Sequence, residues 1–141
     1  MNHRDSISGP PPSVQELRFC EDLRQVATLL AGILVMAAAG SSAAAPDHPM
    51  LQAAERLYQE AADGIRRFRP DAGGRARHRH MLRAAAAIGV ALAAARRRLS
   101  DVGPVLTPLT AGYEELRRAS THLPGFELVS FHQACCARSP E

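Results

Sequence analysis

The stretch from residue 26 to residue 45 contains no charged side chain, and it constrains the fold more than any other feature of the chain. Its apolar residues recur around the whole circumference of a helix, and a helix that is apolar all round is buried. The strongly apolar part is shorter than the roughly 20 residues that a bilayer requires. Thr28, Gly32 and Gly40 also interrupt it. We therefore expect a helix enclosed by a bundle or by an oligomer interface, and no membrane association.

The same stretch has a second interpretation, the apolar region of a secretory signal peptide, because it runs into the small residues Ala43-Ala44-Ala45-Pro46. The preceding segment disfavours export. Residues 1–25 carry three Arg against four acidic side chains, whereas secretory leaders begin short and positive. The three cysteines are an odd number and cannot form a closed disulfide framework. Both observations favour a reducing cytoplasm.

Helix-starting and helix-stopping residues divide most of the chain into helices. Ser13 and Glu16 have the spacing of a capping box, which predicts that the first helix begins there, and Gly40 ends it. For the second helix the sequence predicts Asp47 as the N-cap and Pro49 in the first turn. Pro70 closes that helix.

Two further helices are expected in the second half of the chain. The third runs from Arg75 to Leu99, with Leu82 among its core positions. The fourth begins with Thr107 as the cap and Pro108 in the first turn. Alanine-rich runs in the third helix allow close helix approach. The chain has only two Tyr, four Phe and no Trp, which excludes an aromatic platform for stacking nucleic-acid bases.

These elements predict an all-α, four-helix bundle-like single domain with an extended C-terminal tail. A chain of 141 residues is long enough for one domain with a core. We expect a flexible N-terminal arm at residues 1–12, the bundle at 13–124 and the tail at 125–141. The alternation from Phe126 to Phe131 is typical of a strand, but a lone strand has no partner. The tail is therefore expected to pack over the bundle or pair with a second copy.

Thiols form the first candidate site. Cys135 and Cys136 follow His132 closely, and if the tail folds back along the first helix, Cys20 joins them. Three sulfurs and one nitrogen form a ligand set that Zn accepts. The spacing is weak support, because the two terminal cysteines are adjacent and not two residues apart. The alternatives are a redox-active pair, or a buried apolar Cys20 with inert terminal thiols.

Arginines form the second candidate site. All seventeen basic residues are Arg, but the net charge of +3 is too mild to indicate a partner by itself. A cluster at one helix corner predicts a positive surface for phosphate or for an acidic protein. Its residues are Arg66, Arg67, Arg69, Arg75, Arg77 and Arg79. No nucleic-acid-binding motif surrounds them, so a solvated helix end is the other interpretation.

Motifs of catalysis are missing from the sequence. It has no Gly-rich phosphate loop, no Glu-x-x-His pair and no nucleophile elbow. Cys135 beside His132 lacks the rigid surroundings that a nucleophile needs. We therefore predict a non-enzymatic, cytoplasmic binding protein that acts as a homo-oligomer or holds a protein partner. The alternatives are a metal- or thiol-responsive regulator using the four thiol-site residues, and an anion or nucleic-acid binder using the arginine corner.

Overall fold

The computed structural model describes residues 13–40, 48–97 and 102–120. In these ranges the chain forms four α-helices and no strand, which confirms the predicted all-α, bundle-like fold. A short 3₁₀ helix, η2, precedes the third α-helix. The elements are α2 (Val14–Ala38), α3 (Pro49–Arg67), η2 (Ala72–Gly74), α4 (Arg75–Arg97) and α5 (Gly103–Ser120).

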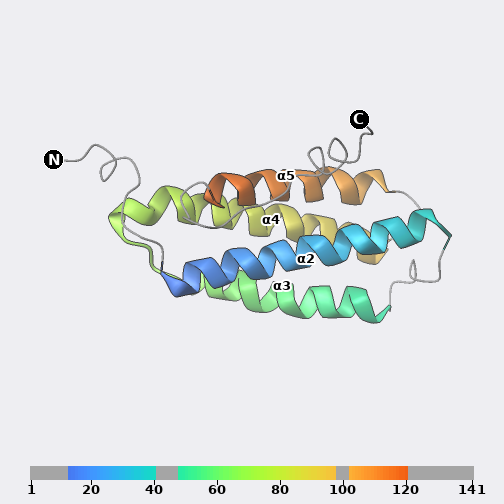
Figure 1. Ribbon diagram of the computed structural model, residues 1–141, viewed down its shortest axis with the longest axis horizontal. Coiled ribbons are helices and arrows are strands. Elements are labelled where there is room, and N and C mark those ends of the chain that lie inside the picture. The colour runs from blue at the N-terminus through green and yellow to red at the C-terminus, as the bar shows by residue number, and fades with distance from the viewer. Residues whose placement is uncertain (1–12, 41–47, 98–101, 121–141) are drawn as a thin grey trace, which may run out of the picture.

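The helices lie side by side with their long axes nearly aligned, and each runs opposite to the one before it (Figure 1). The most extensive contact joins α4 to α5, and the next joins α2 to α3. Contacts of α3 with α4 and of α2 with α5 close the bundle. The starts of α2 and α4 therefore lie at one end of the molecule, together with the ends of α3 and α5.

The predicted limits of α2 are confirmed. The backbone N–H of Glu16 donates to the Ser13 hydroxyl at 3.1 Å, and the Glu16 carboxylate accepts from the Ser13 N–H at 3.0 Å. This reciprocal pair is a capping box. At the other end Gly40 has a φ of 77°, a left-handed conformation that glycine adopts without a steric cost.

The predicted N-cap of α3 is wrong by one residue. His48 is the cap, and its Nδ1 accepts from the Met50 N–H at 3.1 Å. Asp47 lies outside the described residues. With His48 as the cap, Pro49 is the first helical residue, where its missing N–H costs no hydrogen bond.

The predicted start of α5 is also wrong, because the helix begins at Gly103 and contains Pro108 in its interior. The Val102 carbonyl accepts from the N–H groups of Val105 at 3.0 Å and Leu106 at 2.8 Å. These bonds form the first turn of α5, which precedes Thr107 in the sequence. Pro108 then removes a single bond close to the N-terminus of the helix.

Small residues let α4 and α5 approach closely. A Cβ added to Gly112 of α5 would lie 2.7 Å from Ile88 Cγ1 and 3.4 Å from the Ala84 carbonyl oxygen of α4. Ala84 and Ile88 are fully buried in that contact. Leu82, which we expected in the core, is exposed because the buried stripe of α4 passes beside it.

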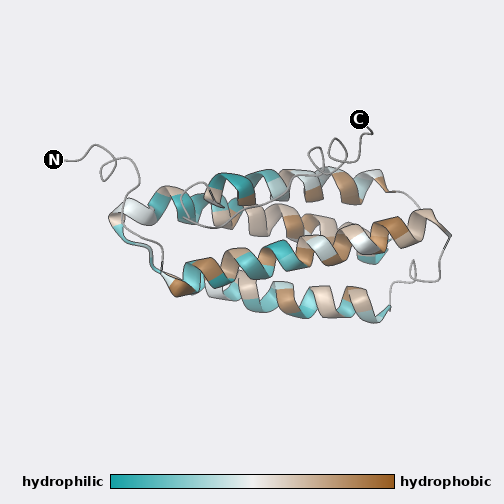
Figure 2. Cartoon of the chain, viewed as in Figure 1, coloured by the Kyte–Doolittle hydropathy of each residue, from teal (hydrophilic) through white to brown (hydrophobic). Residues whose placement is uncertain are grey.

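The uncharged half of α2 is buried on one side only. Leu30 and Ile33 are fully buried, whereas Val35 is 70% exposed. Brown, apolar ribbon dominates this half of α2 in Figure 2. The prediction that the bundle encloses this stretch all round is therefore wrong for the chain on its own, and the oligomer interface stays a prediction. Over the described ranges, no helix has both the length and the apolar character to cross a membrane.

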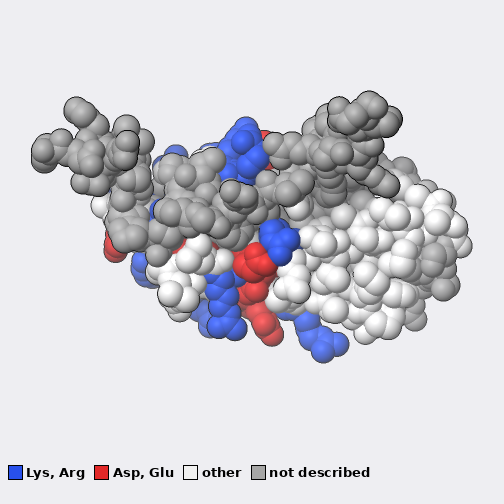
Figure 3. All heavy atoms as spheres, viewed as in Figure 1, with Lys and Arg blue, Asp and Glu red and all other residues white. Residues whose placement is uncertain are grey.

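Charge is segregated along the bundle. Asp, Glu and Arg are absent from residues 25–38 of α2, 49–54 of α3 and 103–113 of α5. The last turn of α4, at the same end of the bundle, carries Arg96 and Arg97. The three uncharged segments lie together at this end, and in Figure 3 most of that half of the visible face is white. We call their exposed residues the uncharged surface.

Candidate functional site

A buried ion pair joins the first turns of α2 and α4. The Arg77 guanidinium donates from Nε to Glu16 Oε2 at 2.8 Å and from its second amino nitrogen to Glu16 Oε1 at 3.1 Å. The side chains are only 4% and 5% exposed. Burial alone would raise the pKa of Glu16, but hydrogen bonds from Arg77 and Ser13 outweigh it and hold that pKa below its usual value. The pair is therefore structural.

Because Arg77 is buried in this pair, the six predicted arginines do not form a single surface cluster. Arg77 points into the protein and is not part of a surface site. Arg66 pairs with Asp63 on its own helix. The remaining four predicted residues are exposed, and none of them has an ion-pair partner within the part of the chain that the structure describes. These four are Arg67, Arg69, Arg75 and Arg79.

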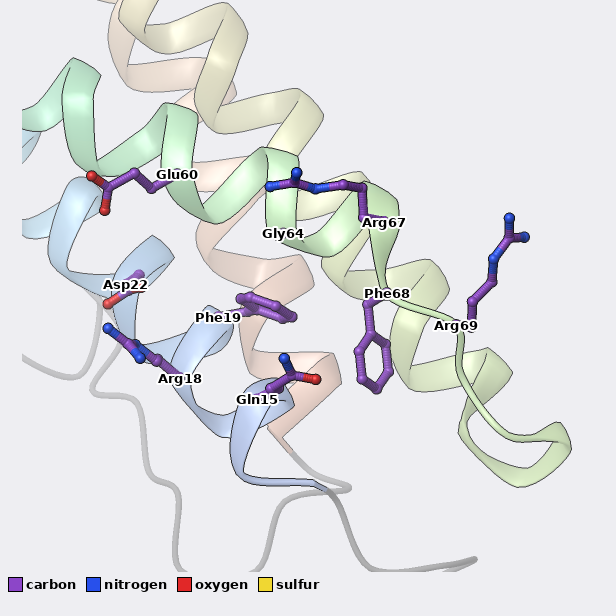
Figure 4. Close-up of a pocket in the computed structure, with 9 residues that line it drawn as sticks. All are labelled: Gln15, Arg18, Phe19, Asp22, Glu60, Gly64, Arg67, Phe68 and Arg69. Atoms are coloured by element: carbon purple, nitrogen blue, oxygen red, sulfur yellow. The ribbon is translucent and has the colours of Figure 1, made fainter.

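An open cavity of about 620 Å³ lies between α2 and α3, near the charged end of the bundle. We call it the α2–α3 groove (Figure 4). Its volume falls within the roughly 300–1,000 Å³ of small-ligand pockets. It includes two of the predicted arginines. The lining residues are Gln15, Arg18, Phe19, Asp22, Glu60, Gly64, Arg67, Phe68 and Arg69.

The middle of the groove is formed by a ring against a glycine. A Cβ on Gly64 would lie 2.4 Å from Phe19 Cε1, so only glycine leaves room for the Phe19 ring on this side of α3. Phe19 also meets Phe68 edge to face, with ring centroids 6.1 Å apart and planes at 77°. Phe68 in turn contacts the His78 ring at 6.1 Å. The aromatic contacts thus tie the end of α3 to both α2 and α4.

The ends of the groove carry opposite charge. Because α2 and α3 are antiparallel, Asp22 lies near Glu60 at one end. Arg67 and Arg69 follow toward the other end, where the Arg67 side chain extends back along α3 and the Arg69 side chain points away from it (Figure 4). Burial raises the pKa of Asp22, Arg18 opposes that rise, and Glu60 adds to it. The acidic end therefore holds two carboxylates that repel each other, partly balanced by one arginine.

The predicted thiol site is only partly described. Cys20 is free and fully buried, and desolvation raises the pKa of its thiol to about 12. His132, Cys135 and Cys136 lie outside the described residues. Among the residues with a described position, no group of three or more His, Cys, Asp or Glu side chains is arranged to hold a metal ion. The Zn site remains a prediction.

Sequence reasoning overlooked most of the groove. Arg18 and Asp22 had not been singled out, and Glu60 had the pattern of a surface charge. The available signal was Gly64, a glycine inside a helix that continues through it, since such a glycine usually has a packing reason.

The chain matches no protein-family model, and searches of curated proteins and of solved structures found no similar protein. The described residues define an all-α helical domain with a polar groove between α2 and α3 and an uncharged surface. The function is therefore argued from these two features.

Proposed function

We propose that this protein is a non-enzymatic helical interaction protein that forms a homodimer through the uncharged surface. The observation that carries the proposal is the exposure of aliphatic side chains within that surface. Val35 of α2 is 70% exposed and Leu106 of α5 is 44% exposed. Single exposed apolar residues are common on proteins, but here the segments of α2 and α5 that carry them also lack charge.

A second copy of the chain is the partner that fits this surface best. Burying a charge without a partner costs several kcal/mol, and two uncharged surfaces that meet incur no such cost. A twofold interface brings the same patch of both subunits together, so a surface with no charge pattern does not repel its own copy. Ala31 and Ala38 beside Val35 also let two α2 helices approach closely.

We propose the cytoplasm as the compartment. Cys20 is a free thiol inside the bundle, and the total of three cysteines leaves at least one without an intramolecular partner. Reduced thiols are usual in the cytoplasm and rare in secreted proteins.

Light scattering coupled to size-exclusion chromatography tests the proposed dimer. The expected result is a mass of twice 15.1 kDa at micromolar concentration. Val35→Glu places a charge in the uncharged surface and should give a monomer with unchanged helicity. Val14→Glu is the matched control, because Val14 is 82% exposed at the opposite end of α2. A monomeric native chain, or equal effects of the two substitutions, would refute the proposed dimer.

A further inference from the structure

We propose that the α2–α3 groove binds a short peptide of about two to three residues that has free termini and an apolar side chain. Its ammonium group would lie at Asp22 and Glu60, its carboxylate at Arg67, and its side chain against the Phe19 ring. This inference does not depend on the proposed dimer, because the groove and the uncharged surface lie at different ends of α2.

Charge separation points to a ligand that carries both signs. Asp22 and Glu60 are close enough to interact electrostatically, and neither has an ion pair within 4 Å in the described ranges. A bound ammonium group would relieve their repulsion. At the other end Arg67 extends over the groove and likewise has no ion-pair partner in the described ranges, and a guanidinium matches the two oxygens of a carboxylate. A purely anionic ligand would leave the two carboxylates of the acidic end balanced by Arg18 alone.

The distance between the charged ends sets the length of the ligand. Glu60 and Arg67 are seven residues apart on the same face of α3. At a rise of about 1.5 Å per residue, their α-carbons are about 10 Å apart along the helix. An extended chain spans about 3.3–3.6 Å per residue, so three residues cover a similar length. A free amino acid is too short to reach both ends.

The middle of the groove favours an apolar side chain. Phe19 and Phe68 line it, and the absence of a side chain at Gly64 lets the Phe19 ring pack against α3. Figure 4 shows the Phe19 and Phe68 rings between Asp22 and Arg69, with the Gln15 amide beside them. An aromatic ring on the ligand would bury apolar surface against them without displacing a charge.

Titration calorimetry with the tripeptide Ala-Phe-Ala tests the site in the full chain. We expect saturable 1:1 binding in the micromolar to millimolar range. N-acetylation and C-amidation should each weaken binding at least about fivefold, as expected when a charge loses its partner. Ala-Ala-Ala should bind more weakly than Ala-Phe-Ala, because it lacks the ring.

Two substitutions assign the termini. Arg67→Ala should weaken Ala-Phe-Ala and remove most of the penalty of C-amidation, while leaving the penalty of acetylation intact. Glu60→Gln should do the reverse. Arg75→Ala is the matched control, since Arg75 is also exposed but does not line the groove, and it should leave affinity unchanged. All three residues are exposed, so circular dichroism should show native helicity.

Three outcomes would overturn the proposal. The first is no saturable binding up to about 10 mM, a range that covers even weak ligands. The second is equal affinity for the free and the doubly blocked peptide. The third is a loss on C-amidation with none on acetylation, which would make the groove a simple anion site.

Discussion

Glu16 and Arg77 are separated by 61 positions in the sequence, yet they form a two-bond ion pair at the centre of one end of the bundle. Glu16 also completes the capping box of α2, so one carboxylate both starts a helix and joins it to α4. Two arginine-donated bonds and one backbone N–H thus converge on it. Loss of this one carboxylate would therefore break a helix cap and an interhelical ion pair together.

Arg77→Met is expected to reduce the free energy of unfolding by about 3–5 kcal/mol, because it leaves the Glu16 carboxylate buried without its partner. Arg66→Met is the control, since the Arg66–Asp63 pair is exposed and should contribute less than about 1 kcal/mol. Urea denaturation measures both. Similar losses in the two variants would show that the buried pair contributes no more to the free energy of unfolding than the exposed pair.

Acid should destabilise the protein through Glu16. Its pKa is lower in the folded chain than its ordinary value of 4.5, so its stabilising contribution is fully present above that pH. The contribution is lost as the pH falls below 4.5 and through the folded-state pKa. Urea denaturation between pH 7 and pH 3 should therefore show a shallower acid loss in Glu16→Gln, which keeps an acceptor for the cap.

Asp22 provides a control of opposite sign. Its pKa is raised in the folded protein, so the ionised carboxylate is destabilising and protonation removes that cost. Asp22→Asn should therefore make the loss of stability on acidification larger. Parallel curves for Asp22→Asn and Glu16→Gln would contradict the assignment of both shifts.

Two glycines inside helices should respond oppositely to alanine. Gly64→Ala should destabilise the fold by about 1–3 kcal/mol, because the new Cβ would lie 2.4 Å from the Phe19 ring. Gly32→Ala should stabilise it by up to about 1 kcal/mol, since the nearest atom is Met50 Cε at 3.8 Å and alanine favours the helix. Thermal denaturation distinguishes them, and the same sign for both would contradict the described α2–α3 packing.

Cys20 should be unreactive in the native protein. A pKa of about 12, three units above its ordinary value of 9.0, lowers the thiolate fraction near neutral pH about a thousandfold, and burial blocks access as well. Ellman's reagent applied to the Cys135→Ser, Cys136→Ser double variant should detect no thiol until urea is added. Rapid reaction of the native variant would show that Cys20 is accessible and would favour the metal or redox alternative.

The fold was predictable where its signals were local. Ser13 with Glu16, Gly40 and Pro70 mark helix limits through bonds or steric constraints within a few residues. The errors arose where two local solutions competed. Asp47 and His48 both suit a cap, and the position of Pro49 decides between them. For α5 we did not anticipate that a helix already begun at Gly103 continues through Pro108.

The site was less predictable because it depends on how helices are placed against each other. Arg77 lies among exposed arginines in the sequence, and only the packing of α4 against α2 buries it beside Glu16. The groove likewise requires the antiparallel register that places Phe19 over Gly64. No spacing within α2 or α3 alone specifies that register.

The segregation of charge along the bundle makes its two ends respond differently to electrolyte. Added salt screens exposed charges over roughly 10 Å at 0.1 M, so occupancy of the groove should fall as the salt concentration rises. Strongly hydrated salts such as sulfate instead strengthen apolar burial, and self-association should persist or increase. A salt titration thus separates the two proposed activities of one small domain without any substitution.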